Sequence, residues 1–519
     1  MSSLPMPTGF YPLTDTQTQK CVFLIFSLIA VTLAHATWDK FTRKLPPVIN
    51  PPKLFDITGM SNKVDFLQQS YKIVQNASTK NSSPYSVHSD LGSIVLLPPK
   101  LADEIKNDAN LNFLQSIEDD FHGSIPGFEP FKANRTIDIM IQVAKKQLTR
   151  SLNTVTQPIS KETAFSLRTI LGDSPEWREI GLVSMNLALV CRLSSRVFLG
   201  EKLCRNKDWL QITADYPVNT HLAASKLRLY PRPLRPIVHW FLPECQLLRR
   251  QAAQARSIIE PVIQQRRQEK RDALDEGRSV PVYDDAIDWA DEQSDQFPYD
   301  PAVLQLALAG AAVHTTTDLL SKVFLELLAQ PELILALRSE IIEVLRAHGW
   351  SKAGLYNLKL MDSILKETQR VKPITMVTMQ RIANADIHLS DGTVIPKGAK
   401  CAVNNTTRLD ATLYENPENF DGYRFLKMRN DPGKENKAQF VTTNVDSLGF
   451  GYGLHACPGR FFAANEVKVA LCHLVLKYDF EFIQDDSSQV AWHGFSLNVN
   501  HEAKIRLRRR KEEIDIDSL

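Results

Sequence analysis

The sequence predicts a mainly helical fold with small β-sheets, preceded by a single N-terminal transmembrane helix. Three features indicate this: an uncharged apolar run near the N-terminus, a long apolar segment in the second half, and short apolar runs between turn residues before residue 100. Of 519 residues, 43% are hydrophobic and 23% charged, which excludes disorder, collagen-like repeats and a polytopic membrane protein. The 61 Lys and Arg against 59 Asp and Glu give a net charge of +2, which indicates no nucleic-acid partner.

The apolar run near the N-terminus spans residues 21–38 and reads CVFLIFSLIAVTLAHATW. As a helix it would rise about 27 Å at ~1.5 Å per residue, close to the thickness of a bilayer's hydrocarbon core. Lys40, Arg43 and Lys44 follow, and this positive excess predicts that the C-terminal side stays cytosolic. A cleaved signal peptide is the alternative, but a long polar segment precedes the run and no clean cleavage site follows it.

The chain divides into five segments. These are a short N-terminal segment (1–20), a transmembrane anchor (21–38), a Pro-rich hinge (39–60), a catalytic body (61–505) and a charged C-terminal tail (506–519). Residues 45–52, LPPVINPP, cannot be helical, and the tail is expected to be solvated. The seven scattered cysteines contain no CxxC pair, which favours a reducing compartment.

Within the body, residues 61–99 show short apolar runs typical of a small sheet. A long helix is expected to begin at Asp300-Pro301, an N-cap residue followed by proline, and to end before Pro331. Its centre holds poor helix formers from His314 to Thr317, which suggests a site, although buried threonine is often structural. Residues 228–241 are basic, aromatic and broken by prolines; they fit a membrane-contacting segment or lid, or an ordinary connection.

The strongest chemical motif is residues 450–460, FGYGLHACPGR, which precede an amphipathic helix. A cysteine at a helix N-terminus meets the positive end of the dipole and backbone N–H groups, and both favour the thiolate. The glycines let the backbone pass close to a flat group. A thiolate is a nucleophile or a metal ligand, and no base for a catalytic cysteine is recognisable nearby. An iron ligand in a haem pocket fits better.

This loop resembles the haem-binding loop, F-G-x-G-x-[R/H]-x-C-x-G, of the cytochrome P-450 superfamily of haem-thiolate monooxygenases. Three further segments occur in that family's order. Residues 366–370, KETQR, resemble its E-x-x-R helix, and residues 419–425, NFDGYRF, resemble the following meander. Residues 311–315, AAVHT, resemble the oxygen-activating part of its central helix. The resemblance implies the cytochrome P-450 fold for the body.

The resemblance also implies a haem b cofactor, with the Cys457 thiolate as axial ligand of the iron. Thr315 would assist proton delivery as a catalytic residue. At the position before Thr315 the family usually has an acidic residue, and this chain has His314. His314 is either a second catalytic residue that relays protons or a packed neutral residue. The family's W-x-x-x-R motif is missing near residues 137–150, so Lys145 and Lys146 are the alternative candidates for its role, with His455 the firmer partner of a haem propionate. The further cofactor-binding residues are Phe450, Gly451, Gly453, His455, Gly459 and Arg460, and the structural network is Glu367, Arg370 and Arg424.

Family members take electrons from an NADPH–cytochrome P-450 reductase, and the resemblance implies the same partner here. Lys427, Arg429 and Lys468 are the candidate docking residues. An apolar pocket is expected, which suits a lipophilic polycyclic small molecule. Its expected lining is Leu308, Ala311, Ala312, Ile374, Met376, Val377 and Phe495. The expected location is the endoplasmic reticulum membrane, single-pass, with a cytosolic catalytic domain.

Several stretches resemble microsomal enzymes of fungal secondary metabolism. Residues 195–206, 235–243 and 121–130 are similar to fungal ent-kaurene oxidase and to monooxygenases of indole-diterpene and meroterpenoid pathways. Two other functions stay open: a reductase-independent haem-thiolate isomerase or dehydratase acting on peroxides, and a haem-dependent binding or sensing protein. The presence of Thr315 argues against the isomerase, and nothing in the sequence supports the sensor.

Overall fold

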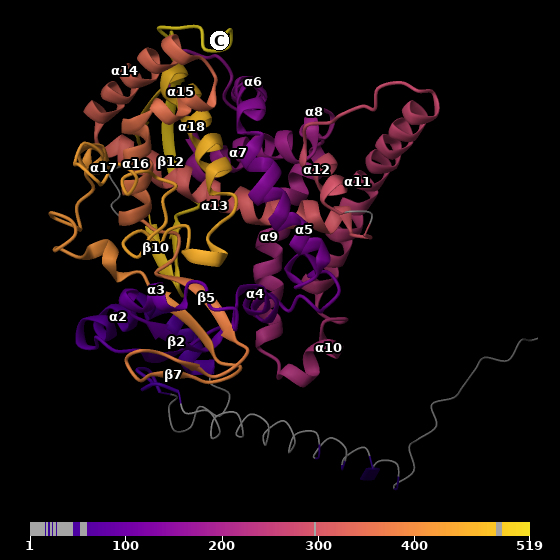
Figure 1. Ribbon diagram of the computed structural model, residues 1–519, viewed down its shortest axis with the longest axis vertical. Helices are drawn as coiled ribbons and strands as arrows, with labels where there is room; N and C mark the ends of the chain where they lie inside the picture. Colours follow the sequence, from indigo (N-terminus) through magenta and orange to yellow (C-terminus); the bar gives the residue numbers. More distant parts are fainter. Residues whose placement is uncertain are drawn as a thin grey trace, which may run out of the picture.

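The body of the chain is mainly helical, with small separate sheets: β2, β5 and β7 lie at one end of the body, whereas β12 lies beside α18 (Figure 1). The structure is a computed structural model that describes residues 16, 19, 20, 23, 27, 45–51, 60–294, 297–483 and 490–519. The predicted transmembrane segment, residues 21–38, lies almost wholly outside the described residues. The predicted mainly helical class with small sheets is confirmed.

The helices group around one long central helix. The longer helices are α2 (Met60–Lys80), α4 (Phe113–Phe121), α5 (Arg135–Val143), α6 (Leu152–Leu171), α7 (Leu182–Phe198), α9 (Lys207–Arg228), α11 (Pro243–Asp275), α12 (Ala286–Gln293), α13 (Pro301–Ala329), α14 (Pro331–His348), α16 (Lys359–Val371) and α18 (Arg460–Lys477). The shorter helical pieces are η1 (Pro99–Leu101), α3 (Ala102–Ile105), η2 (Glu129–Phe131), η3 (Ala144–Leu148), α8 (Gly200–Leu203), η4 (Arg232–Leu234), α10 (Arg235–Val238), α15 (Lys352–Asn357), η5 (Thr406–Leu409), α17 (Arg424–Arg429) and η6 (Gly453–His455).

The strands form separate small sheets. They are β1 (Tyr85–Ser89), β2 (Gly92–Leu97), β3 (Leu111–Asn112), β4 (Arg178–Gly181), β5 (Val377–Ala383), β6 (Ile387–His388), β7 (Val394–Ile395), β8 (Lys400–Asn404), β9 (Tyr478–Phe482), β10 (Val490–His493), β11 (Ser496–Val499) and β12 (Lys504–Arg509). The largest has the order β1-β2-β8-β5-β3, and another has the order β4-β12-β9. Strands β2 and β8 are parallel, whereas β1–β2 and β5–β8 are antiparallel.

The predicted central helix is confirmed as α13. The Asp300 side chain accepts a hydrogen bond from Val303 N at 3.0 Å, and Pro301 occupies the first turn, as expected of a capped helix start. Helices α5, α7, α9, α11 and α16 all pack against α13, and Figure 1 shows it in the middle of the body. It is long and apolar enough to cross a bilayer, but 61% of its most apolar window is buried inside the body, so it is a core helix.

The prediction of a sheet over residues 61–99 is wrong for its first half. Residues 60–80 form α2, whereas only β1 and β2 form the expected hairpin. The buried positions of α2 include Phe66, Ser70, Val74 and Ala77, spaced three and four apart as on one helical face. The apolar pair Ile73-Val74 therefore belongs to a helix that packs against β1 and β10.

The C-terminal tail is also different from expectation, because it docks instead of extending into solvent. Residues 504–509 form β12, and Ile516 is fully buried. Trp350 Nε1 donates to Ile516 O at 2.9 Å, and Lys477 Nζ pairs with both carboxylate oxygens of Asp517, at 2.6 and 2.7 Å. The charges of the tail are thus used for attachment to the body.

Candidate functional site

The loop that carries Cys457 is closed by its own backbone. Cys457 N donates to Phe450 O at 2.7 Å, and Gly451 N donates to Leu448 O at 2.8 Å. The Phe450 ring packs edge-on against Phe440, with centroids 5.0 Å apart. Helix α18 begins at Arg460, so the cysteine lies just before a helix N-terminus, where the sequence predicts it.

A neighbouring turn after α3 holds the loop from outside. Gly453 has a φ of +76°, and an added Cβ would lie 2.4 Å from Lys106 O, so only glycine fits. Leu454 N donates to Lys106 O at 3.1 Å and to Asn107 Oδ1 at 3.0 Å. Tyr452 completes the attachment, because its hydroxyl lies 2.8 Å from Asp103 Oδ1.

The thiol of Cys457 is half-buried, and this burial raises its pKa. The backbone N–H groups of Gly459 and Arg460 bond to the sulfur and act in the opposite direction, as does the Arg460 guanidinium. The predicted helix-terminus effect is therefore present, but burial outweighs it. A thiolate at this position therefore needs a cation bound to it, and iron bound by the sulfur would be such a cation.

The Arg460 side chain holds the cysteine loop through hydrogen bonds to two backbone carbonyl oxygens. Its Nε donates to Val441 O at 3.1 Å, and its Nη1 donates to Cys457 O at 2.8 Å. The predicted cofactor-binding residue is thus a positioning residue for the cysteine in this structure. Gly459, in contrast, has nothing within 4 Å of an added Cβ.

The middle of α13 faces open space. Ala311 and Thr315 are exposed although they lie in the central helix, and an added Cβ on Gly310 would meet nothing within 4 Å. The Thr315 hydroxyl donates to Ala311 O at 2.8 Å, which is the back-bonding expected of threonine in a helix. This strip of small residues next to one hydroxyl leaves room for a flat group over the helix.

His314 has a partner of its own on α9. Its Nε2 donates to Ala214 O at 2.9 Å, so Nδ1 carries the lone pair in the neutral ring. Burial lowers the pKa of His314. The ring therefore ties the centre of α13 to α9 as a neutral group.

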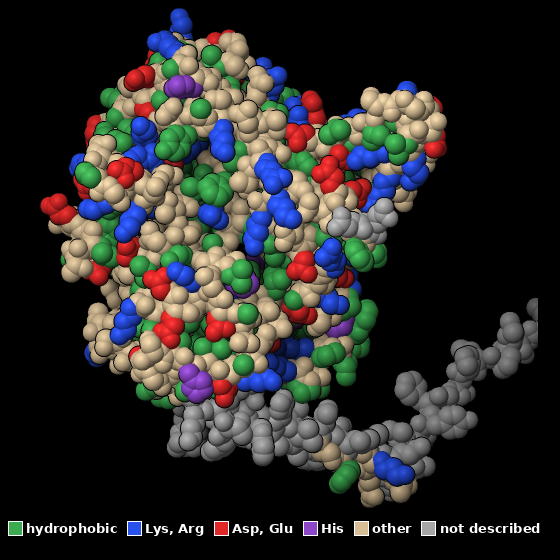
Figure 2. All heavy atoms as spheres, in the orientation of Figure 1, with side chains coloured by type: hydrophobic (Ala, Val, Ile, Leu, Met, Phe, Trp, Pro, Cys, Tyr) green, Lys and Arg blue, Asp and Glu red, His purple; other side chains and the backbone are tan. Residues whose placement is uncertain are grey.

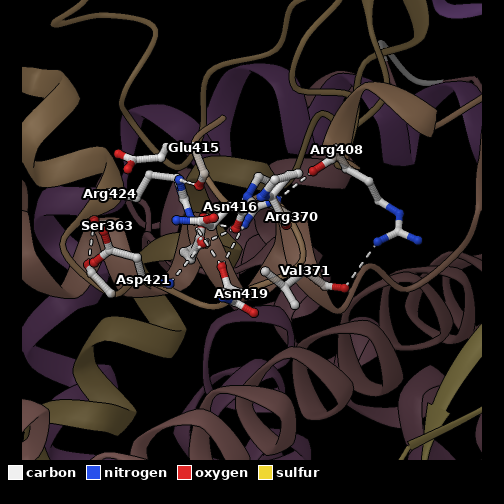
Figure 3. Close-up of polar contacts among 12 residues, drawn as sticks. Ser363, Arg370, Val371, Arg408, Glu415, Asn416, Asn419, Asp421 and Arg424 are labelled. Atoms are coloured by element: carbon white, nitrogen blue, oxygen red, sulfur yellow. Dashed lines mark hydrogen bonds and ion pairs between the residues drawn. The ribbon is translucent and has the colours of Figure 1, made fainter. Parts of the chain in front are cut away.

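The three charged residues of the predicted network lie together. Arg370 Nη2 and Nε pair with the two oxygens of Glu367 at 2.7 and 2.8 Å, and Arg424 Nε bonds to Glu367 Oε1 at 2.9 Å. Both arginines also donate to Asn419 O in the meander (Figure 3). Helix α16 reaches the cysteine loop through Gln369, which lies so close to Gly449 that an added Cβ would clash with it at 2.3 Å. The network thus fixes the segment that precedes the cysteine.

Arg381, on β5, is a residue of this site that the sequence analysis missed. It is 3% exposed, and its Nη2 has no hydrogen-bond partner among the described residues. The positive charges of Arg381 and Lys145, together with burial as the largest cause, lower the pKa of His455 to about 4. Phe113 lies between them, 5.4 Å from the Arg381 guanidinium and 6.0 Å from the His455 ring. The Nη1 of Arg381 donates to Gln380 O at 2.7 Å, so the guanidinium keeps one free donor, and a buried donor of this kind near histidine and lysine fits a bound carboxylate.

The predicted pocket-lining residues fall into two groups by exposure. Leu308, Met376, Val377 and Phe495 are at most 7% exposed and belong to the hydrophobic core. Phe495, for example, packs edge-on against Phe66 with centroids 4.9 Å apart. Ala311 and Ile374 are exposed and Ala312 is half-buried, so these three apolar side chains are accessible, and the predicted lining as a whole stays a prediction.

The predicted docking residues also change. Arg429 and Lys468 both pair with Asp362, at 2.6 and 2.7 Å, with side chains at most 10% exposed, and so present no free charge. Lys427 is exposed but pairs with Asp421 at 3.2 Å. An open concavity of about 400 Å³ instead lies against the cysteine loop, lined by Lys145, Leu454, Pro458, Arg460 and Phe461 among others. Among the residues that the structure describes, no acidic side chain lines it.

Comparison with known proteins identifies relatives over nearly the whole chain. The family described as Cytochrome P450 matches residues 157–507. Cytochrome P450 monooxygenase hepE of Aspergillus oryzae is 45% identical over 97% of this chain and 90% of its own length. Cytochrome P450 monooxygenase 1 of Gibberella fujikuroi is 46% identical over 83% of this chain and 99% of its own. Cytochrome P450 monooxygenase adrA of Penicillium rubens is 41% identical over 90% of this chain and 92% of its own.

Proposed function

This chain belongs to the cytochrome P450 family of haem-thiolate monooxygenases, and from that premise we propose that it hydroxylates C–H bonds of a lipophilic polycyclic natural product in fungal secondary metabolism. The substrate class we propose is a terpenoid, an indole-diterpene or a meroterpenoid. We further propose that residues 21–38 anchor it in the endoplasmic reticulum membrane, with the catalytic body in the cytosol.

The observation that carries the proposal is the Cys457 loop at the start of α18, in a chain whose central helix exposes Ala311 and Thr315. Cys457 would hold haem iron through its sulfur, with the N–H groups of Gly459 and Arg460 directed at that sulfur. Arg381, His455 and Lys145 would bind the haem carboxylates, since the buried Arg381 has an Nη2 with no hydrogen-bond partner among the described residues. When bound, haem supplies activation of dioxygen for insertion of one oxygen atom into a C–H bond.

The chain's own residues supply position and proton control. The Thr315 hydroxyl, held by Ala311 O, is placed to pass protons on the open side of α13. The exposed apolar side chains of Ala311 and Ile374 favour a hydrophobic substrate surface and exclude water around it. His314, engaged with Ala214 O, we assign to joining α13 and α9.

We assign the electron supply to an NADPH–cytochrome P-450 reductase that docks at the concavity beside the cysteine loop. Lys145 and Arg460 line this concavity, and no acidic side chain in the described part of the chain does, which suits a partner with an acidic face. Lys145 also lies on the π-helical turn η3, a type of irregularity that is frequent at functional sites.

The test uses microsomes that contain this chain and a reductase, incubated under labelled dioxygen with polycyclic diterpenes, indole-diterpenes and meroterpenoids. NADPH-dependent incorporation of one labelled oxygen atom is the expected result, and Cys457→Ala abolishes it. Conversion of a peroxide substrate without NADPH would support a reductase-independent isomerase instead. Activity retained by Cys457→Ala would overturn the assignment of the iron ligand.

A further inference from the structure

A second cavity, of about 140 Å³, lies away from the cysteine loop. It is enclosed by the end of α4, the end of α9, the segment η4–α10 and the turn between β1 and β2. Its basic lining residues are Lys63, Arg228, Arg232, Arg235 and Lys400. Because a water molecule occupies about 30 Å³ of liquid volume, the cavity has room for a group with several heavy atoms.

The acidic residues of this cavity do not use up its positive charge. Asp119 is shared between Lys400, at 2.7 Å, and Arg232, at 3.1 Å, and Asp120 also pairs with Lys400. The third carboxylate, Asp90, lies 3.5 Å from Arg228. The lining therefore holds five cationic and three anionic side chains, so cationic side chains outnumber anionic ones.

Arg235 carries the clearest unused charge. Its Nε donates to Tyr230 O at 3.0 Å, and no described carboxylate lies within ion-pair distance of its guanidinium. Burial and the positive charges of Arg232 and Arg228 lower the pKa of Arg235 to about 10. The carboxylate of Asp119 acts in the opposite direction but does not reverse the shift.

His122 adds an independent polar group. It is 8% exposed, lines the cavity, and its Nε2 has no hydrogen-bond partner among the described residues. Its backbone is in the left-handed region, with φ of 56°, at the C-terminal end of α4. A buried imidazole nitrogen without a partner is costly unless something binds to it.

The surroundings of the cavity indicate where its ligand comes from. The segment 228–241, which carries Arg228, Arg232 and Arg235, also exposes large apolar side chains. These are Leu229, Tyr230, Ile237, Trp240 and Phe241, which are 38–76% exposed. Figure 2 shows Lys and Arg side chains next to hydrophobic ones along this end of the molecule. Apolar and aromatic side chains around arginines are typical of a segment that lies in a membrane interface.

The N-terminal segment leaves the body at this same end. Ile49 N donates to Ser86 O at 3.0 Å, and Ser86 N donates to Pro47 O at 2.8 Å, so residues 47–49 run along β1. Figure 1 places α10, α4 and β2 together at that end. Only eight residues separate Trp38, the end of the predicted anchor, from Pro47, and a segment of this length spans at most about 30 Å.

We propose that this cavity binds the phosphate group of an anionic phospholipid, with Arg232 and Arg235 as its main ligands. Guanidinium groups bind phosphate through paired, charge-assisted hydrogen bonds, and His122 Nε2 would donate or accept one more. The proposal rests on the membrane attachment proposed above and adds a lipid preference to it. Bound lipid would orient the body on the bilayer with residues 228–241 in the interface.

The test uses the full chain in detergent micelles, with native mass spectrometry to count retained lipid. The double variant R232Q/R235Q is compared with R271Q/R278Q, which removes the same charge from exposed arginines near the far end of α11. We expect the wild-type chain and R271Q/R278Q to retain phosphatidic acid in preference to phosphatidylcholine. R232Q/R235Q should bind phosphatidic acid roughly tenfold more weakly, because charge-assisted hydrogen bonds are lost.

A second measurement does not depend on the variants. Hydrogen exchange of residues 228–241 in the wild-type chain should slow with phosphatidic acid and stay unchanged with phosphatidylcholine. Equal retention of both lipids, or unchanged binding by R232Q/R235Q, would overturn the proposal. Protection by inorganic phosphate alone would also overturn it, because the ligand would then be a free phosphate. Membrane fractionation and hydroxylase activity report on the proposed function separately, since neither depends on lipid selectivity.

Discussion

The Nζ atom of Lys322 donates a hydrogen bond of 2.7 Å to the carbonyl oxygen of Leu497, and so joins α13 to β11. The same Nζ donates to Pro373 O at 3.2 Å and pairs with Asp318 at 2.6 Å. The Lys322 side chain is 1% exposed. One buried ammonium thus connects the central helix to the two chain segments beside Ile374, the exposed apolar residue of the proposed pocket.

Replacing Lys322 by methionine should therefore change both stability and product pattern. The substitution keeps the side-chain length but leaves Asp318 and two carbonyl groups without their donor. Breaking a buried ion pair costs about 3 kcal/mol or more, which a lowered thermal midpoint would show. We also expect additional hydroxylation positions in the product mixture, because Pro373 and Leu497 are no longer held. Lys434→Met, at an exposed ion pair, is the control; an unchanged product ratio in Lys322→Met would contradict this role.

Features determined by local sequence were predicted well. The start of α13 depends on the Asp300 side chain as N-cap and on the Pro301 ring in the first turn. The cysteine loop depends on glycine spacing within eleven residues. Both features can be predicted without knowledge of the fold, because the residues that interact lie within a few positions of one another. The helical spacing of Phe66, Ser70, Val74 and Ala77 was also present in the sequence, but the short apolar runs around it resembled strands.

Features that depend on distant partners were missed. Arg381 lies on β5, whose alternating pattern gives no reason to expect a buried guanidinium. The tail resembled a solvated segment because its charges find their partners only after folding: Asp517 pairs with Lys477, and Ile516 O accepts from Trp350, 166 residues away in sequence. Sequence patterns report local periodicity and not such long-range pairings.

The Glu367 network should be indispensable for a folded haem site. Glu367 is fully buried and accepts hydrogen bonds from Arg370, Arg424 and the backbone N of Asp421. Glu367→Gln leaves two buried or partly buried guanidinium groups without a counter-charge, at a cost of about 3–5 kcal/mol. We expect little haem-loaded protein in the reduced carbon monoxide spectrum. The matched control is Glu415→Gln, because only the Glu415 backbone carbonyl takes part in the network; equal haem loading in both variants would refute this role.

Glu466 on α18 should make stability fall as pH rises. The residue is fully buried, Ser194 Oγ donates to its Oε1 at 2.7 Å, and burial raises its pKa from 4.5 to about 8. Between these two values the native state keeps a proton that the unfolded chain has released, so the free energy of unfolding decreases with pH in that window. A shift of this size corresponds to at most about 5 kcal/mol.

The substitution Glu466→Gln tests this dependence, because the amide keeps an acceptor for Ser194 and cannot ionise. Its thermal midpoint should lie close to that of the wild-type chain near pH 5 and above it at pH 8. Glu513→Gln, at a largely exposed ion pair, controls for a change of net charge. Parallel pH profiles of the wild-type chain and Glu466→Gln would show that Glu466 is not the group responsible.

The bond from His314 Nε2 to Ala214 O separates two roles that the sequence left open. If His314 holds α13 against α9, His314→Gln should preserve most activity, since its amide N–H can still donate, whereas His314→Leu should lose the bond and about 1 kcal/mol of stability. If His314 relays protons, both variants should lose product yield per NADPH equally, because neither side chain titrates. Burial lowers the pKa of His314, so the ring is neutral at pH 7. Its burial reduces the free energy of unfolding only at pH values below the ordinary pKa of histidine. We therefore expect His314→Gln to match the wild-type yield per NADPH at pH 7, and an equal loss in both variants would establish the relay instead.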